Sequence, residues 1–266
     1  MPWSPVAIAF ALTLFAGLAT GIGSALALLT SRTNTRILSA ALGFSAGVMI
    51  YVSLVEILAD ARMSLGAEFG ARAGAWLSVL GFFGGIALTA LIDRLVPAVE
   101  NPHEVHRVEE MHRRSDAHLM RMGLVSAAAI ALHNFPEGIA TFVAALDHPR
   151  LGASIAAAVA LHNIPEGIAV AVPVYYATGS RARAFSWSFL SGLSEPLGAL
   201  VAYVLFAGVP GAALRGILFA AVAGIMVFIS FDELLPTARE YGEHHVAVYG
   251  LIAGMALMAT SLALML

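Results

Sequence analysis

Two copies of one ten-residue string place metal-binding residue types inside apolar sequence. Residues 131–140 read ALHNFPEGIA and residues 160–169 read ALHNIPEGIA, with nine of the ten positions identical. Neither lipid nor an apolar core satisfies the polar groups of histidine, asparagine and glutamate. Their burial is therefore costly unless they are paired or bind a cation. The repeated string indicates a buried polar site to which both copies contribute.

The spacing within each copy puts the polar side chains on one helical face, because residues three or four apart are neighbours on a helix. The side chains are His133, Asn134 and Glu137 in the first copy, and His162, Asn163 and Glu166 in the second. Pro136 and Pro165 lack a backbone N–H, so each is expected to kink its helix and free one carbonyl. Two such helices facing each other would surround one or two cations with imidazole, amide and carboxylate donors.

This set of donors predicts a divalent transition metal. Mixed nitrogen and oxygen ligands suit Zn²⁺, Fe²⁺, Mn²⁺ or Co²⁺, whereas Ca²⁺ and Mg²⁺ prefer oxygen. The chain has no cysteine, which excludes thiolate ligands. Glu195 is the single acidic residue of its apolar segment and precedes Pro196, and it is predicted to form a third wall of the site. A His–Glu pair that merely ties two helices together is the alternative, and the duplication of the motif argues against it.

The elements that carry these residues are predicted to be membrane-spanning helices of a single domain, residues 1–266. Hydrophobic residues make up 59% of the chain and charged residues 12%, against about 25% charged residues in typical soluble proteins. Eight apolar segments reach the length of about 20 residues that a helix needs to span a bilayer. They are residues 5–30, 36–58, 74–97, 121–145, 151–177, 184–207, 211–235 and 246–266. The first is too long for the apolar part of a signal peptide, so it is expected to remain as a span.

The connection between the third and fourth segments, residues 98–120, is predicted to be a solvated, histidine-rich loop. Its histidines are His103, His106, His112 and His118. They would bind metal ions weakly, although a loop without any metal role has the same composition. All 14 basic residues of the chain are arginine, and ten of them face the cytoplasm if both termini are outside, against four on the other side. Cytoplasmic loops carry the excess of positive charge, so this orientation is favoured and puts the loop in the cytoplasm.

A second, weaker repeat links the second and seventh predicted spans, at residues 46–58 and 223–235. The matching pairs are Met49 with Met226, Ser53 with Ser230, and Glu56 with Glu233. The two spans run in opposite directions, which predicts an inverted repeat of helices 1–3 and 6–8 around central helices 4 and 5, as in many secondary transporters. Chance likeness of apolar helices is the alternative. Met49, Glu56 and Glu233 are further ligand candidates, with core packing (Met49) and solvated carboxylates near span ends (the two glutamates) as alternatives.

The paired strings HNFPEG and HNIPEG, preceded by the histidine-rich connection, resemble the signature of the ZIP (Zrt/Irt-like) family of divalent metal transporters, and the chain is most similar to bacterial members. The resemblance implies an eight-helix bundle in the lipid of the bacterial inner membrane, with both termini outside and usually a homodimer. It implies uptake of zinc, and of iron, manganese, cobalt or cadmium, into the cytoplasm by alternating access through a site that can hold two metals. The ligands that it implies are His133, Asn134, Glu137, His162, Asn163, Glu166 and Glu195, and more loosely Met49.

Other function classes lack their sequence signals. The HExxH string of zinc proteases is absent, and so is the P-loop of nucleotide-binding proteins. A net charge of −3 does not suggest a nucleic-acid partner. A membrane protein that senses metal without moving it is the remaining alternative, and the inverted repeat argues against it. We therefore expect a transporter and not an enzyme.

Overall fold

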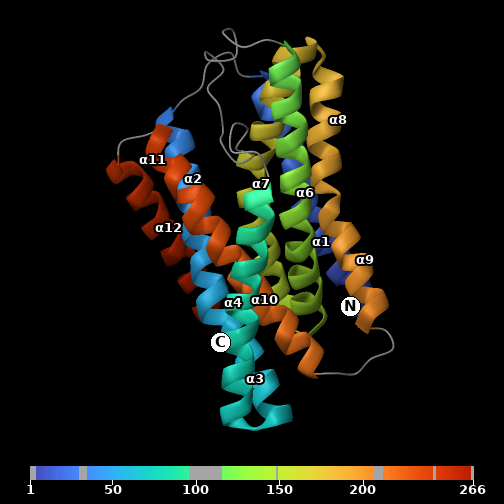
Figure 1. Ribbon diagram of the computed structural model, residues 1–266, viewed down its shortest axis with the longest axis vertical. Helices are drawn as coiled ribbons and strands as arrows, with labels where there is room; N and C mark the ends of the chain where they lie inside the picture. Colours follow the sequence, from blue (N-terminus) through green and yellow to red (C-terminus); the bar gives the residue numbers. More distant parts are fainter. Residues whose placement is uncertain are drawn as a thin grey trace.

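All regular elements that the structure describes are helices (Figure 1). The computed structural model describes residues 4–29, 35–95, 116–147, 149–206, 212–241 and 244–264. Within these ranges, eight helical segments are long and apolar enough to cross a membrane. The predicted all-α membrane fold with eight transmembrane helices is therefore confirmed.

Several spans contain more than one element, because π-helical segments (η1 and η3) or a break interrupt them. The first four spans are α1 (Pro5–Leu29), α2 (Thr35–Val52) with η1 (Ser53–Ile57) and α3 (Leu58–Phe69), α4 (Ala71–Leu95), and α6 (Asp116–Asp147). The last four are α7 (Pro149–Thr178), α8 (Arg181–Gly192) with α9 (Ser194–Phe206), α10 (Ala212–Ile229) with η3 (Ser230–Leu234) and α11 (Leu235–Tyr241), and α12 (His244–Ala263). Helices α6 and α7 continue through Pro136 and Pro165.

The second span extends beyond its predicted end at residue 58 and continues through α3 to Phe69. Ala61 and Leu65, one helical turn apart, are completely buried. Gly216 of α10 makes room for them, since a Cβ at that position would lie 2.6 Å from Cγ of Leu65. Apolar packing therefore stabilises the helix beyond residue 58, where the polar residues suggested that the span would end. The chain turns towards α4 only at Gly70, whose φ of 83° favours glycine.

The predicted loop is shorter than 98–120 at its end, because α6 begins at Asp116. His118 consequently lies half-buried in the first turn of a helix, which corrects its prediction as a loop residue. Leu119 and Met122 are 2% and 1% exposed and pack with Val172 of α7. Their burial stabilises an early helix start in a stretch whose charges suggested a loop.

The sixth span is divided between α8 and α9 at Leu193. Pro196 has no N–H with which to bond the carbonyl of Gly192, so the regular helical pattern is interrupted there. Gly192 packs against Gly17 of α1, where a Cβ on either residue would lie 2.5 Å from the carbonyl oxygen of the other. The break places Glu195 in the first turn of α9.

Contacts between helices divide the bundle into two groups. The first group (residues 5–29 and 116–206) holds α1, α6, α7, α8 and α9, which pack mainly on one another; the second group (residues 35–95 and 212–263) holds the other helices. Contacts of α7 with α2 and α12, and of α6 with α10, join the groups and are sparse. Figure 1 shows α6, α8 and α9 on one side of the molecule and α2, α11 and α12 on the other. The fold thus contains two bodies with a thin interface.

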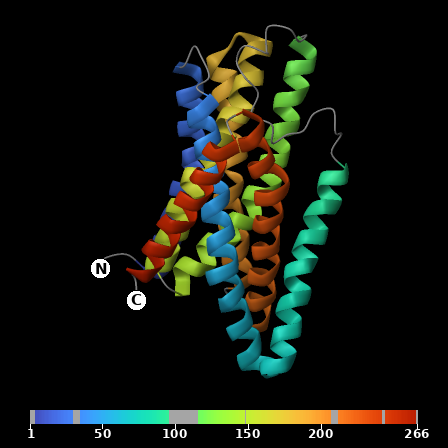
Figure 2. The same ribbon diagram turned by 90° about the vertical axis from the view of Figure 1, so that its left-hand side faces the viewer.

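The two π segments occupy matching positions of the predicted inverted repeat. η1 begins at Ser53 and η3 at Ser230, and they contain Glu56 and Glu233. Helices α2 and α10 run in opposite directions, and α1 begins at the end of the bundle where α12 ends (Figures 1 and 2). Chance likeness of apolar helices does not account for the same distortion at matched residues. Such segments occur frequently at functional sites.

Candidate metal centre

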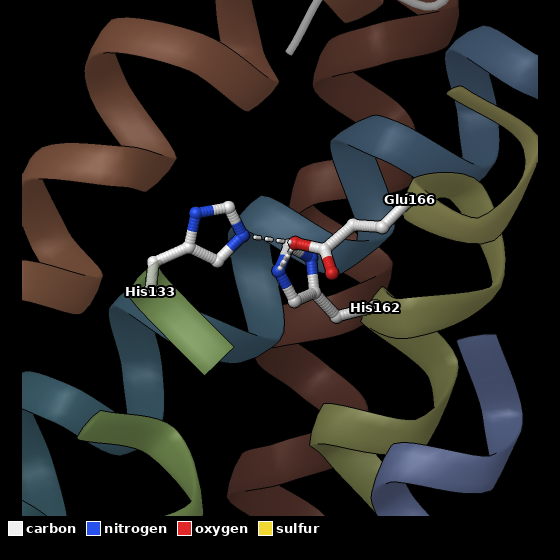
Figure 3. A group of neighbouring side chains, drawn as sticks. All are labelled: His133, His162 and Glu166. Atoms are coloured by element: carbon white, nitrogen blue, oxygen red, sulfur yellow. Dashed lines mark hydrogen bonds and ion pairs between the residues drawn. The ribbon is translucent and has the colours of Figure 1, made fainter. Parts of the chain in front are cut away.

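His133, His162 and Glu166 form a buried cluster between α6 and α7 (Figure 3). Nε2 of His133 lies within hydrogen-bonding distance of Oε1 of Glu166, at 2.6 Å, and Nε2 of His162 lies 2.7 Å from the same oxygen. One potential ligand atom of each residue lies within 4.8 Å of the others. Zn²⁺ takes nitrogen and carboxylate ligands at about 2.0–2.2 Å. A cation of this size therefore fits the cluster after small side-chain shifts.

Asn163 is oriented by acceptors on two other helices. Its amide nitrogen donates to the carbonyl of Ala16 in α1 at 2.9 Å, and to the carboxylate of Glu195 in α9. An asparagine amide has two N–H groups, and both are used here, so Oδ1 is the atom left for a ligand. Oδ1 is buried and accepts no hydrogen bond from the described residues. The two hydrogen bonds thus hold Asn163 with its uncharged Oδ1 available to a cation.

Two motif glycines bring neighbouring backbones against the site. A Cβ on Gly138 would lie 2.6 Å from Cα of Glu195, and a Cβ on Gly167 would collide with the carbonyl oxygen of Thr20. The absence of side chains at these positions permits close helix contact. The first contact places Glu195, which is completely buried, beside α6 and within reach of Asn163.

The first copy of the motif presents polar groups that the protein itself does not satisfy. Asn134 and Glu137 are 0% and 1% exposed, and their four side-chain nitrogen and oxygen atoms form no hydrogen bond with a described residue. The hydroxyl of Thr141, one turn further along α6, is in the same condition. Buried polar groups without partners call for a specific explanation, and an uncompensated buried charge costs several kcal/mol. A bound cation would supply that compensation.

Three other predicted ligands lie in the second helix group. Met49 is 1% exposed and belongs to the main hydrophobic core. Glu56 is half-buried and does not lie near a span end, because the helix continues to Phe69. Glu233 is 5% exposed and lines a cavity of about 70 Å³ together with His133. Of the loop histidines, His103, His106 and His112 lie outside the described residues.

Two residues near the site were not predicted. Ser45 of α2 places its Oγ 2.9 Å from Nδ1 of His162, and Asp93 of α4 lines the cavity shared by His133 and Glu233. The sequence contains a signal for each. Ser45 lies one helical turn before Met49 on the same face, and Asp93 is the single acidic residue of the third predicted span.

The arrangement can strip the water from a divalent cation and replace it with protein donors. The cluster offers two imidazole nitrogens and a carboxylate, and the adjoining Asn134, Glu137 and Asn163 present further oxygen atoms. All the predicted ligands of the two motif copies and Glu195 belong to α6, α7 and α9, in the first helix group. The site is therefore carried by one of the two bodies.

Known proteins resemble this chain over nearly its whole length. The ZIP zinc transporter family profile matches residues 96–262. "Zinc transporter ZupT" of Clostridium perfringens is 57% identical, with 97% of this chain and 96% of the relative covered. The proteins of the same name from Lysinibacillus sphaericus and Chlorobium luteolum are 60% and 61% identical, covering 98% and 97% of both chains respectively. With eight spans and a buried His–Glu cluster on the repeated motif, the chain belongs to the ZIP family of membrane transporters, which are not enzymes.

Proposed function

We propose that this protein moves divalent transition-metal cations, zinc in the first place, across the bacterial inner membrane into the cytoplasm. The observation that carries the proposal is the buried cluster of His133, His162 and Glu166, together with Asn134 and Glu137, whose buried side chains form no hydrogen bond with a described residue. The name of the relatives supports zinc as the substrate. Iron, manganese, cobalt and cadmium are alternative substrates, because the same nitrogen and oxygen donors accept them.

The donors suffice for two cations side by side. One cation would bind the two Nε2 atoms and Glu166, and a second would bind the oxygen-rich part of the site. That second part consists of Asn134, Glu137, Asn163 and Glu195. A bridging position of Glu166 or Glu137 would keep the carboxylates together in a medium of low dielectric. Met49 is a further candidate ligand, because it lies one turn from Ser45, which contacts His162.

Alternating access would arise from displacement of the first helix group against the second. The thin interface between the groups favours such a movement, and the ligands on α6, α7 and α9 would travel with the first group. The cation would then be exposed to one side of the membrane and afterwards to the other. An inside-negative potential drives a divalent cation inwards, since each charge gains about 2.3 kcal/mol per 100 mV.

The cavity lined by His133, Glu233 and Asp93 supports a release route towards the cytoplasm. Asp93 lies close to the end of α4 that precedes the histidine-rich connection. In the orientation favoured by the arginines, with both termini outside, that end faces the cytoplasm. Glu233 and Asp93 would receive the cation after His133, and Glu56 would serve the opposite entrance through the inverted repeat.

A homodimer is part of the proposal, and α4 is the surface where we place the contact. Only 11% of the most apolar stretch of this helix is buried against the rest of the chain. The exposed side chains include Trp76, Leu80 and Phe83. Because the chain has no cysteine, a single Leu80→Cys substitution would report the contact by disulfide formation between two copies in lipid. If no disulfide forms between two copies through α4, the proposed dimer contact at α4 is wrong.

Metal uptake into proteoliposomes tests the function. Purified wild type, Glu137→Ala and Glu166→Ala are reconstituted with an internal zinc indicator, and flux is followed after addition of Zn²⁺ and then of the other cations. Both variants are expected to insert normally and to lose flux. Glu68→Gln, which alters an exposed carboxylate on α3, is the matched control and should transport as the wild type does. Undiminished flux in both motif variants would contradict the proposed site.

A further inference from the structure

The structure assigns to Ser45 the role of positioning His162 and of linking its orientation to the relative placement of the two helix groups; this inference rests on the proposed function. Oγ of Ser45 lies 2.9 Å from Nδ1 of His162, and both side chains are 1% exposed. Ser45 is on α2 in the second group, whereas His162 is on α7 in the first. The hydrogen bond therefore joins the two bodies directly at a proposed ligand.

The geometry places the two ring nitrogens of His162 against different partners. Nε2 lies 2.7 Å from Glu166 within the cluster, so Nδ1 is the nitrogen that faces Ser45. A histidine that binds metal through one nitrogen nearly always donates its other N–H to a neighbouring group, which fixes the ring. Ser45 occupies that place for His162. Without it, the imidazole would be free to rotate away from Glu166 and the cation.

A hydroxyl suits this position because it both donates and accepts. When Nε2 carries the proton, Nδ1 accepts a hydrogen bond from Ser45. When a cation occupies Nε2, the proton is on Nδ1, which then donates to the oxygen of Ser45. The ring holds one proton in both arrangements, and the bond persists. A carbonyl or carboxylate could serve only the second arrangement.

Movement between the bodies would break this bond. If α7 shifts against α2 by more than about an ångström, the contact exceeds hydrogen-bonding distance, and His162 loses its orienting partner. The site would then hold the cation more weakly in the displaced state than in the state seen here. A difference in affinity between two states is what allows a ligand to shift the equilibrium between them. Ser45 would thus favour capture in one state and release in the other.

Four variants test this role: Ser45→Ala, Ser45→Thr, Ser39→Ala and His162→Ala. Ser39 is the matched control, since it is also a completely buried serine of α2, and its hydroxyl donates to the carbonyl of Ala238 within the second group at 2.6 Å. The measurements are the dissociation constant of Co²⁺ on the purified protein, the visible absorption of bound Co²⁺, and the KM and maximal rate of flux in proteoliposomes.

We expect Ser45→Ala to weaken Co²⁺ binding by about tenfold or more, to alter the cobalt spectrum and to raise KM more than it lowers the maximal rate. Ser45→Thr should restore the spectrum and the affinity, and Ser39→Ala should match the wild type. If Ser45→Ala does not fold, Ser45→Cys keeps the volume with a weaker donor and should show the same loss. If Ser45→Ala or Ser45→Cys binds Co²⁺ as the wild type does while His162→Ala loses binding, the role of Ser45 is overturned but the proposed site is not. Wild-type binding by His162→Ala would overturn the proposed site itself.

Discussion

The two copies of the repeated motif are almost identical in sequence and opposite in their surroundings. In the second copy, Glu166 contacts both histidines, and Asn163 donates to Ala16 and to Glu195. In the first copy, the equivalent Glu137 and Asn134 are equally buried but form no side-chain hydrogen bond with the described residues. The neighbours therefore decide the role of each copy.

The difference arises from the helices that surround α7. Helix α2 provides Ser45, α1 provides the carbonyl of Ala16, and α9 provides Glu195, and all three act on the second copy. We infer that protein neighbours hold the second copy in place, whereas the polar groups of the first copy gain their partner when the cation binds.

The largest effect on flux is expected from locking α7 to α12, because the proposed mechanism requires the first helix group to move against the second. Oγ of Ser154 in α7 lies 3.0 Å from Oγ of Ser261 in α12, across the interface of the two groups. A Ser154→Cys/Ser261→Cys double variant should form a disulfide there, because the two Cβ atoms must lie close together. Oxidation is expected to reduce zinc flux to background, and reduction should restore it. The two single variants are the controls, and full flux through the oxidised pair would exclude relative movement at this interface.

Replacing the two glutamates by leucine should change stability in opposite directions. Glu166→Leu leaves two buried imidazoles without their shared partner, which is expected to cost about 3–5 kcal/mol. Glu137→Leu removes an unpaired buried carboxylate and is expected to stabilise the metal-free protein by about 1–3 kcal/mol. Thermal unfolding in the presence of a chelator measures both changes.

Zinc provides the second readout for the same pair of variants. A cation that binds only the folded state raises the unfolding temperature, and both variants should lose this rise. Shifts of the same sign in the metal-free proteins would contradict the contrast between the copies.

The asparagines offer a smaller contrast. Asn163→Ala removes two donated hydrogen bonds and leaves Glu195 without its donor, for an expected loss of about 2 kcal/mol. Asn134→Ala removes no described bond and should leave the stability of the metal-free protein nearly unchanged. Chemical unfolding of both variants without metal measures this difference, and equal losses would show that Asn134 has a structural partner.

The sequence was sufficient to predict an all-helical chain with eight membrane-spanning segments, because hydropathy is a local property. It could not predict the asymmetry between the copies, since Ser45, Ala16 and Glu195 approach the motif from distant parts of the chain. The extension of α3 to Phe69 and the early start of α6 at Asp116 also depend on partners, namely α10 and α7. The π segments are invisible to hydropathy, although the serine–glutamate match marks where they occur.

The smallest expected effect comes from the histidine-rich connection. Replacement of His103, His106 and His112 by alanine should lower the rate of uptake without abolishing it, because the ligands on α6 and α7 are unchanged. His118→Ala, which alters a half-buried residue of α6, is made separately. Initial rates in proteoliposomes measure both variants, and a complete loss of flux in a correctly folded triple variant would give the connection an essential role.

Anomalous X-ray diffraction at the zinc absorption edge, from crystals grown with Zn²⁺, tests the central claim most directly. The account predicts a peak within coordination distance of Nε2 of His133, Nε2 of His162 and the carboxylate of Glu166, with Glu137 and Asn134 turned towards the metal. Zinc peaks only at other places, with both motif copies unchanged from the arrangement described here, would contradict it.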